Sequence, residues 1–195
     1  ARTAGATALF RGTNLRSAAA ANVSTLIFTA APTLTGAAGA AGTTTMSVLK
    51  GAFGDTSLSG TGSDMVTVIS NKLSPLAAEE YAGDLQTANA NVKLTADRAA
   101  VATNTNSLIL NGFGITNPGG AVTIPISSAS LAGNILINSA TNIAGSNTTL
   151  GITTTELDIL ATANSTISAV IGTATTGSLT LSGTGNVTLS AANLY

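Results

Sequence analysis

Residues 178–190 read SLTLSGTGNVTLS, two short alternating runs separated by Gly183-Thr184-Gly185. In the first run the leucines fall on one side and the hydroxyl residues on the other, which is the period of two that a half-buried β-strand requires. The run at 186–190 repeats the pattern directly after the glycines. Glycine adopts the positive-φ conformations that sharp corners demand. This stretch therefore predicts two strands joined by a tight corner.

Similar alternating runs occur along most of the chain, separated by Gly, Asn, Pro and Ser. We expect strands at residues 23–29, 43–49, 65–70, 91–95, 107–110, 122–126, 134–138, 167–171, 178–182 and 186–190. Two segments predict helical turns instead. Segment 74–81 places Ser74 before Pro75 and acidic residues in the early turns. Segment 153–160 has Thr153 and Glu156 at capping-box spacing, and a corner followed by a strand is its alternative.

Two all-β architectures fit these strands: a parallel β-helix (β-solenoid), and an antiparallel β-sandwich subunit with strand exchange. Only 8 % of the residues are charged, His and Cys are absent, and the run 99–155 contains no Asp, Glu, Lys or Arg. Stacked coils bring equivalent positions within about 4.8 Å, where like charges repel while Thr, Ser and Asn form ladders. Low charge therefore favours the solenoid. We expect one elongated domain over 1–195, with a looser segment at 1–22 and a terminal strand-exchange segment at 177–195.

The same composition leaves few groups for catalysis or metal binding. Asp55 and Asp64 flank a Gly/Ser/Thr-rich loop, but the repeated Gly-Gly-x-Gly-x-Asp of calcium-binding solenoids is absent. Glu156 and Asp158 would share one face of an extended strand, as the carboxylate pairs of β-helical glycosidases do, yet no other charged residue lies between Ala99 and the end of the sequence. We therefore predict no catalytic, cofactor-binding or metal site and no enzyme activity.

Parts of the chain resemble bacterial surface proteins. Residues 176–183 (TGSLTLSG) followed by 189–195 (LSAANLY) resemble the GTLTLSGANTY signature of autotransporter-associated β-strand repeats. Residues 157–159 (LDI) followed by 170–177 (VIGTATTG) resemble the rungs of filamentous-haemagglutinin-like proteins, and 24–36 is similar to an opening strand of such passengers. The resemblance implies an extracellular or cell-surface protein with a β-helical fold and a structural or adhesive role.

Charge is unevenly placed along the chain, because the charged residues of 1–54 are all basic whereas those beyond residue 98 are both acidic. The open ends of a β-helix present unpaired backbone groups, and ends that differ in sign favour a head-to-tail contact that propagates. We therefore predict a structural protein that self-assembles as a homo-oligomer or homopolymer into a fibre or surface layer through β-strand stacking. The candidate assembly contacts are Arg2, Arg11, Arg16, Asn186, Val187, Leu189, Leu194 and Tyr195.

The alternative function is an adhesin or glycan-binding module of the passenger type, whose Thr/Ser/Asn faces meet a surface glycan. Sugar sites usually present aromatic platforms, and this chain has only two Tyr and four Phe. Threonine-rich triplets also suggest an ice-binding solenoid, but they do not recur at one spacing. Scattered arginines without neighbouring aromatics do not make a nucleic-acid surface. No run approaches the roughly 18 to 20 apolar residues of a transmembrane helix. We therefore expect no nucleic-acid partner and no transmembrane helix.

Overall fold

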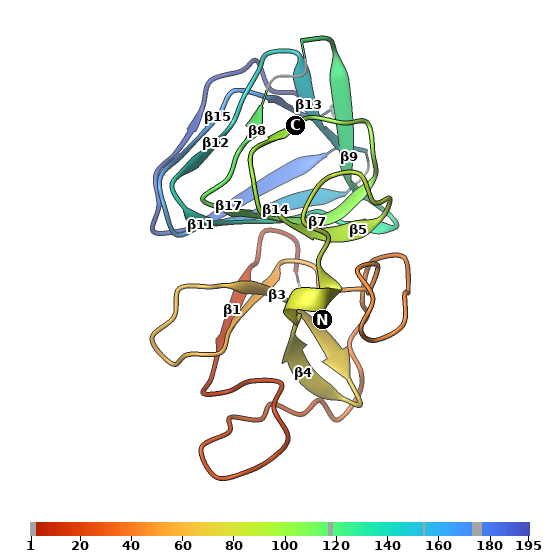
Figure 1. The fold of residues 1–195 in the computed structure, drawn as a ribbon, viewed down its shortest axis with the longest axis vertical. Helices are drawn as coiled ribbons and strands as arrows, with labels where there is room; N and C mark the ends of the chain where they lie inside the picture. Colours follow the sequence, from red (N-terminus) through yellow and green to blue (C-terminus); the bar gives the residue numbers. More distant parts are fainter. Residues whose placement is uncertain (1–2, 117–118, 154, 173–176) are drawn as a thin grey trace.

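The computed structural model describes residues 3–116, 119–153, 155–172 and 177–195, and it is nearly all β (Figure 1). Residues 3–81 form an N-terminal module, and from residue 82 the chain winds into a parallel β-solenoid of about three turns. The predicted β-solenoid is thus confirmed, and the sandwich alternative is not formed. Among the described residues, no helix is long and apolar enough to span a bilayer.

The N-terminal module contains a four-stranded sheet in the order β1-β2-β3-β4. Its elements are β1 (Ala8–Arg11), β2 (Ala52–Asp55), β3 (Asp64–Ile69), β4 (Lys72–Pro75) and the 3-10 turn η1 (Ala78–Glu80). β1 runs parallel to β2, whereas β2, β3 and β4 pair antiparallel. Ser70 and Asn71, with φ of 51° and 61°, join β3 to β4. Two consecutive positive φ angles suit the right-handed twist of a β-hairpin.

The solenoid has three parallel faces, seen down its axis in Figure 1. The junction sheet, which faces the N-terminal module, has the order β17-β14-β11-β7-β5; the polar sheet has the order β18-β15-β12-β8-β6; and the third sheet has the order β10-β9-β13-β16. Only the short strand β10 pairs antiparallel within these sheets as described. The bounds are β5 (Ala90–Lys93), β6 (Arg98–Ala99), β7 (Thr105–Asn111), β8 (Ile115–Thr116), β9 (Val122–Ser128), β10 (Leu131–Ala132), β11 (Asn134–Ser139), β12 (Thr141–Ile143), β13 (Thr148–Ile152), β14 (Glu156–Ala161), β15 (Ser165–Ile167), β16 (Val170–Ile171), β17 (Ser178–Gly183) and β18 (Val187–Leu189).

Aliphatic residues at equivalent positions of successive coils fill the solenoid interior. The register of the junction sheet aligns one inner column, Val92, Leu108, Ile135, Ile159 and Leu181. The first four of these side chains have 0 % exposure. Full burial of such a side chain stabilises the fold by about 1.5–3 kcal/mol. The alternation of the sequence therefore has a direct cause, because every second residue of a strand enters this shared core.

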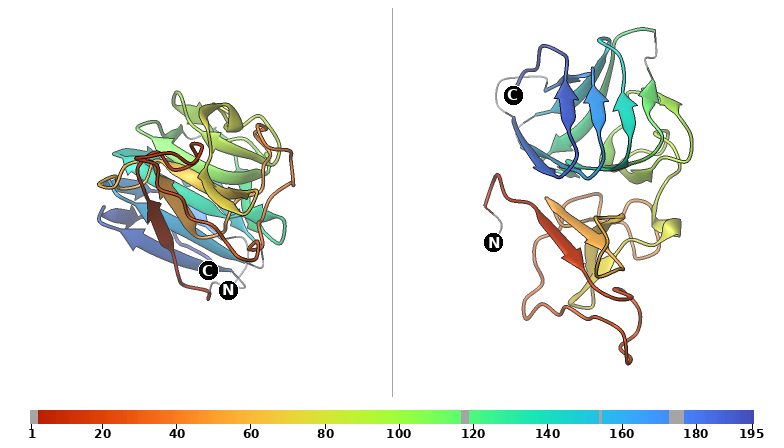
Figure 2. Two further views of the ribbon diagram at one scale, coloured as in Figure 1. Left: turned by 90° about the horizontal axis from the view of Figure 1, so that it is seen from below. Right: turned by 90° about the vertical axis from the view of Figure 1, so that its left-hand side faces the viewer.

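The outer face of the junction sheet carries an apolar row across its middle strands, which the sequence did not predict. Ile109, Leu136 and Leu160 point away from the solenoid interior and share a buried cluster with Phe53 and Met65 of the N-terminal module. Figure 1 and the right-hand view of Figure 2 place the module directly against this sheet. Strands β7, β11 and β14 are therefore covered on both faces, and their burial patterns are nearly continuous.

Most predicted strands are confirmed, but the N-terminal ones are not. The expected strands from 65–70 to 134–138, and those at 178–182 and 186–190, overlap β3, β5, β7, β9, β11, β17 and β18, while 167–171 spans the corner between β15 and β16. Segments 23–29 and 43–49 form no strand, and only isolated bridges join Ile27 to Lys72 and Val48 to Thr35. The alternation at 23–29 correctly indicates which side chains face the core, because Leu26 and Phe28 pack against it. The segment runs beside β4 over too few residues to form a β-strand.

The two predicted helical turns need correction. Ser74 and Pro75 belong to β4, so the turn is confined to Ala78–Glu80. Of the segment 153–160, residue 154 lies outside the described residues, and from residue 156 the chain is not helical: β14 (Glu156–Ala161) is a buried strand, as in the alternative of a corner followed by a strand. Its parallel pairing with both β11 and β17 outweighs a weak local capping signal.

Candidate assembly surface

The N-terminal end of the solenoid is covered by the chain itself. The Ala82 amide donates to the Asn91 carbonyl, and the Lys93 amide donates to the Ala82 carbonyl, both at 2.9 Å. Leu85 is 1 % exposed and belongs to the solenoid core. The Asn91 amide also donates to the Thr44 carbonyl of the N-terminal module at 2.7 Å. The first strand of the junction sheet therefore has chain packed along its outer edge.

At the C-terminal end, which we call the open end, the described residues add no further coil. β17 and β18 are the terminal strands of their sheets, so each pairs with one neighbouring strand. Leu181 lies opposite the fully buried Ile159 in the register, yet it is 46 % exposed because the described chain adds no coil above it. Leu194 and Tyr195 are 47 % and 48 % exposed. An edge strand of this kind leaves alternate backbone N–H and C=O groups unpaired. The result is an apolar surface with a row of available hydrogen-bonding groups.

The last coil is nevertheless well ordered on its inner side. The Leu194 amide donates to the Ile171 carbonyl, and the Ile171 amide donates to Asn193 Oδ1, both at 2.8 Å. At the corner after β17, Gly183 has a φ of +105°, and an added Cβ would meet the Ala161 carbonyl oxygen at 2.0 Å. Only glycine allows this corner to stack so closely on the corner below. The last coil is thus fixed to the coil below it by backbone and side-chain hydrogen bonds and by a close-packed glycine corner.

The structure separates the predicted assembly contacts into two places. Five of them, Asn186, Val187, Leu189, Leu194 and Tyr195, lie on the last coil at the open end. Arg11 is exposed at the end of β1, the terminal strand of the N-terminal sheet. Arg16 is engaged within the chain, and Arg2 lies outside the described residues. Sequence reasoning did not name Leu181 among these contacts, although the predicted strand-exchange segment 177–195 contains it. The assembly role of these residues stays a prediction.

Arg16 forms a double hydrogen bond with Glu80, which is completely buried. Its Nη1 and Nη2 donate to Oε2 at 2.6 Å and to Oε1 at 2.8 Å. The amides of Ala77 and Gly42 donate to the same carboxylate at 2.8 and 3.0 Å. Burial acts to raise the pKa of Glu80, but the hydrogen bonds from Arg16 and the two amides outweigh it and lower the pKa. The ionised pair therefore holds η1 to the irregular loops of the module.

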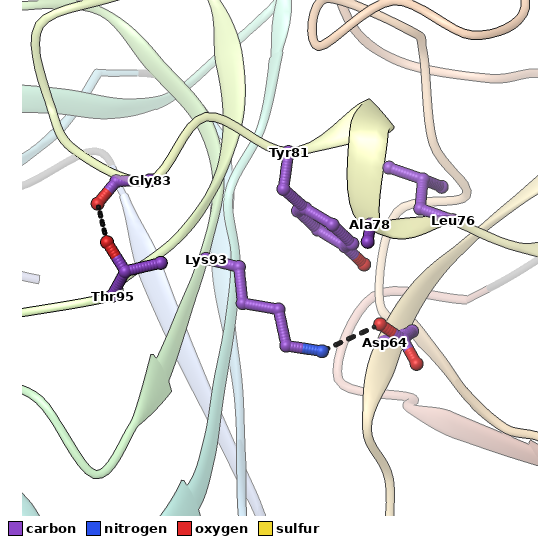
Figure 3. Close-up of a pocket in the computed structure, with 7 residues that line it drawn as sticks. All are labelled: Asp64, Leu76, Ala78, Tyr81, Gly83, Lys93 and Thr95. Carbon is purple, nitrogen blue, oxygen red and sulfur yellow. Dashed lines mark hydrogen bonds and ion pairs between the residues drawn. The ribbon is translucent and has the colours of Figure 1, made fainter.

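A hollow of about 420 Å³ lies where the module meets the solenoid (Figure 3). Its lining residues are Asp64, Leu76, Ala78, Tyr81, Gly83, Lys93 and Thr95. Lys93 Nζ lies 3.0 Å from Asp64 Oδ1 and 5.5 Å from the centre of the Tyr81 ring. The polar groups of the hollow thus pair with one another across the junction.

Tyr81 is a structural residue of this junction. Its hydroxyl accepts a hydrogen bond from the Met65 amide at 2.8 Å. Burial, together with the nearby Asp64 charge, raises the pKa of Tyr81 well above its usual range. The phenol therefore stays protonated at neutral pH. Nor do the described residues contain a group of three or more His, Cys, Asp or Glu side chains that could hold a metal ion.

The two carboxylates that the sequence placed on one face are both buried against the N-terminal module. Glu156 is 6 % exposed and Asp158 is 0 % exposed. The Gly5 amide donates to Glu156 Oε1 at 2.7 Å, and Lys50 Nζ lies 3.9 Å from Asp158 Oδ2. Because the module covers them, a polysaccharide has no access to these groups. The basic partner Lys50 could not be foreseen from the local sequence around β14.

Asp55 and Asp64, which flank the loop after β2 and carry the oxygen atoms that calcium would need, both pair with groups of the chain itself. Asp55 Oδ1 accepts the Ser57 amide at 2.9 Å, and its Oδ2 accepts the Gly62 amide at 3.1 Å. Asp64 instead pairs with Lys93. The Asp55 carboxylate therefore ties the loop 55–62 together as a turn.

A shallow polar groove of about 450 Å³ crosses the outer face of the polar sheet. Its lining residues are Ala140, Thr141, Asn142, Asn164, Ser165, Thr166, Asn186 and Thr188. Side-chain amides link successive coils here: Asn142 Oδ1 accepts the Thr166 amide at 3.2 Å, and Asn164 Oδ1 accepts the Asn186 amide at 3.0 Å. These ladders are the Asn/Thr stacking that the low charge predicted.

Comparisons with protein-family models, with curated proteins and with solved structures find no match to this chain. The resemblance to autotransporter-associated repeats and filamentous-haemagglutinin-like proteins therefore stays a prediction.

Proposed function

We propose that this chain is a structural subunit that self-assembles into an extracellular fibre or surface layer, with the open C-terminal coil as its main contact. The single observation that carries the proposal is the inner column that runs from Val92 to Leu181 and ends half exposed. Covering Leu181, Leu194 and Tyr195 removes apolar surface from water at about 25 cal/mol per Å². A partner strand laid along β17 also satisfies the backbone groups at its edge.

The charge distribution supports contact between identical copies at this end. Residues 159–195 contain no Asp, Glu, Lys or Arg. Two copies that meet through the last coil therefore bring no like-charged side chains together, which would otherwise oppose association. An extracellular setting is consistent with the charge-poor composition and with the resemblance of residues 176–195 to bacterial surface repeats.

A continuous fibre needs a second contact surface, because the N-terminal end of the solenoid is covered. The terminal strand β1, with the exposed Arg11, supplies a second sheet edge on the other part of the molecule. Pairing β17 of one copy with β1 of the next is a heterologous contact and propagates. Pairing β17 with β17 of a second copy is isologous and stops at a dimer.

Negative-stain electron microscopy together with sedimentation of the full chain tests this proposal. Wild-type protein should form filaments or sheets, and Leu181→Lys should abolish them because it places a charge in the open column. Thr166→Lys is the matched control, since it adds the same charge on the outer face of the polar sheet. A monomeric wild-type protein, or assembly that survives Leu181→Lys, would overturn the proposal. Discrete dimers would retain the contact at the open coil and discard the fibre.

A glycan-binding module is the second candidate, and the groove on the polar sheet favours it. Asn142, Asn164 and Thr188 present amides and a hydroxyl that suit sugar hydroxyl groups. A glycan array probed with the monomeric Leu181→Lys protein tests this candidate. Binding that Asn164→Ala weakens would support it, whereas an array without signal would reject it.

A further inference from the structure

A buried cluster lies where the chain before β2 meets β11 and β14. Lys50 Nζ donates to the carbonyl oxygens of Ala132 and Glu156, both at 2.6 Å. It also lies 3.9 Å from Asp158 Oδ2. The Lys50 side chain is 21 % exposed, and the Asp158 side chain is 0 % exposed. A primary amine and a carboxyl group are thus held close together at a site largely shielded from water.

The main chain on both sides of Lys50 is clamped by one side chain of the solenoid. Asn134 Oδ1 accepts the Gly51 amide at 2.8 Å, and Asn134 Nδ2 donates to the Leu49 carbonyl at 2.9 Å. Asn134 in turn lies opposite Asp158 in the β11–β14 register. The main chain of Lys50 is therefore anchored to β11, the strand that pairs with the Asp158 strand β14. Such fixed geometry replaces a bimolecular encounter and gives effective molarities of about 10⁵–10⁸ M in well-oriented reactions.

We propose that Lys50 and Asp158 condense to an intramolecular amide that covalently joins the N-terminal module to the solenoid. The ammonium first passes a proton to the Asp158 carboxylate, which gives a neutral amine and a carboxylic acid. Nζ then attacks Cγ and forms the new C–N bond, the C–OH bond breaks, and the hydroxyl leaves as water with a proton from the nitrogen. The reaction needs no oxidant, reductant or added group.

The reaction requires the neutral amine and the neutral carboxylic acid. The proton passes directly between the two groups, because Lys50 Nζ already lies 3.9 Å from Asp158 Oδ2. The carbonyls of Ala132 and Glu156 accept hydrogen bonds from Nζ and hold it beside the carboxyl group.

Intact mass spectrometry of the denatured full chain tests the proposal. The expected mass is lower than that of the free sequence by one water, about 18 Da. Trypsin gives a second readout, because Lys50 in an amide is not cleaved and no Lys or Arg follows Arg98. Residues 17–72 should therefore stay joined to residues 99–195 in the digest, and fragmentation should place the link at Lys50 and Asp158.

Lys50→Arg is the matched control, because it keeps the positive charge but lacks the primary amine. Its mass should equal that of its own free sequence, and its digest should contain no joined peptides. A wild-type chain that is folded but has the full unmodified mass would overturn the proposal and leave an ordinary ion pair. A loss of ammonia, about 17 Da, with a link at Asn134 would also overturn it by naming a different acyl partner. Because the wild-type measurement alone decides, the proposal stays testable even if the variant fails to fold.

Discussion

The N-terminal module and the solenoid use the same small aliphatic and hydroxyl residues but are stabilised differently. In the solenoid, equivalent side chains repeat from coil to coil, and Leu108, Ile135 and Ile159 each contact the coil above and the coil below. In the module, long irregular segments depend on particular contacts such as the Arg16–Glu80 pair. Repetition spreads the stabilisation over many similar side chains, whereas the irregular part concentrates it in a few.

The largest expected effect is in the middle of the repeated core. Ile135→Ala removes a side chain with 0 % exposure that has coils on both sides. We expect a loss of about 2–5 kcal/mol in the free energy of unfolding, because neighbouring coils cannot collapse into the cavity. Urea unfolding followed by far-UV circular dichroism measures it. A loss below about 1 kcal/mol would mean that the coils adjust independently of each other, contrary to a shared core.

The next effect is confined to the module. Arg16→Ala leaves the completely buried Glu80 carboxylate without its cation, and we expect a loss of about 2–4 kcal/mol, discounted because Arg16 is partly exposed. Hydrogen exchange should show weaker amide protection in β1–β4 and unchanged protection in β11 and β14. Glu80→Gln is the companion variant, since it keeps the shape and removes the charge. Equal loss of protection in both parts would show that they unfold as one cooperative unit.

The same pair sets the response to acid. Because the folded pKa of Glu80 is lowered, its contribution to stability is complete above the ordinary carboxyl pKa of about 4.3 and is lost as the pH falls through the lower folded value. Between pH 5 and 8 stability should change little, since the chain has no His. Thermal unfolding at a series of pH values measures this response. A cooperative loss of structure between pH 5 and 8 would contradict it, and Arg16→Ala should flatten the decline at acid pH.

The contrast between the two parts also explains what the sequence could predict. In the solenoid each strand lies beside a coil of similar sequence pattern, so the local alternation at 178–182 and at 134–138 was sufficient to place β17 and β11. At Ile27 the alternation was just as clear, but the side chain is 69 % exposed and the ladder is missing. Alternation reports which side faces the core, and it does not report whether a pairing strand lies alongside.

Contacts between distant segments lay beyond sequence reasoning for the same reason. Neither the Arg16–Glu80 pair nor the position of Lys50 beside Asp158 leaves a local signal, because each depends on how the module docks. The five candidates at the last coil were placed at one end from their position in the chain alone. Leu181 required knowing that the inner column stops there.

The smallest expected effect separates two polar residues that face outward from the solenoid, one under the N-terminal module and one on the polar sheet. Asn134 is covered by the module and hydrogen bonds to its main chain, whereas Thr166 lies on the outer face of the polar sheet. We expect Asn134→Ala to cost about 1–3 kcal/mol, because it leaves the buried Gly51 amide without its acceptor and removes one of the two donors to the Leu49 carbonyl. Thr166→Ala should stay within about 0.5 kcal/mol. Urea unfolding of both variants measures the difference. An equal loss in the free energy of unfolding for both variants would mean that the hydrogen bonds between Asn134 and the module add no stability.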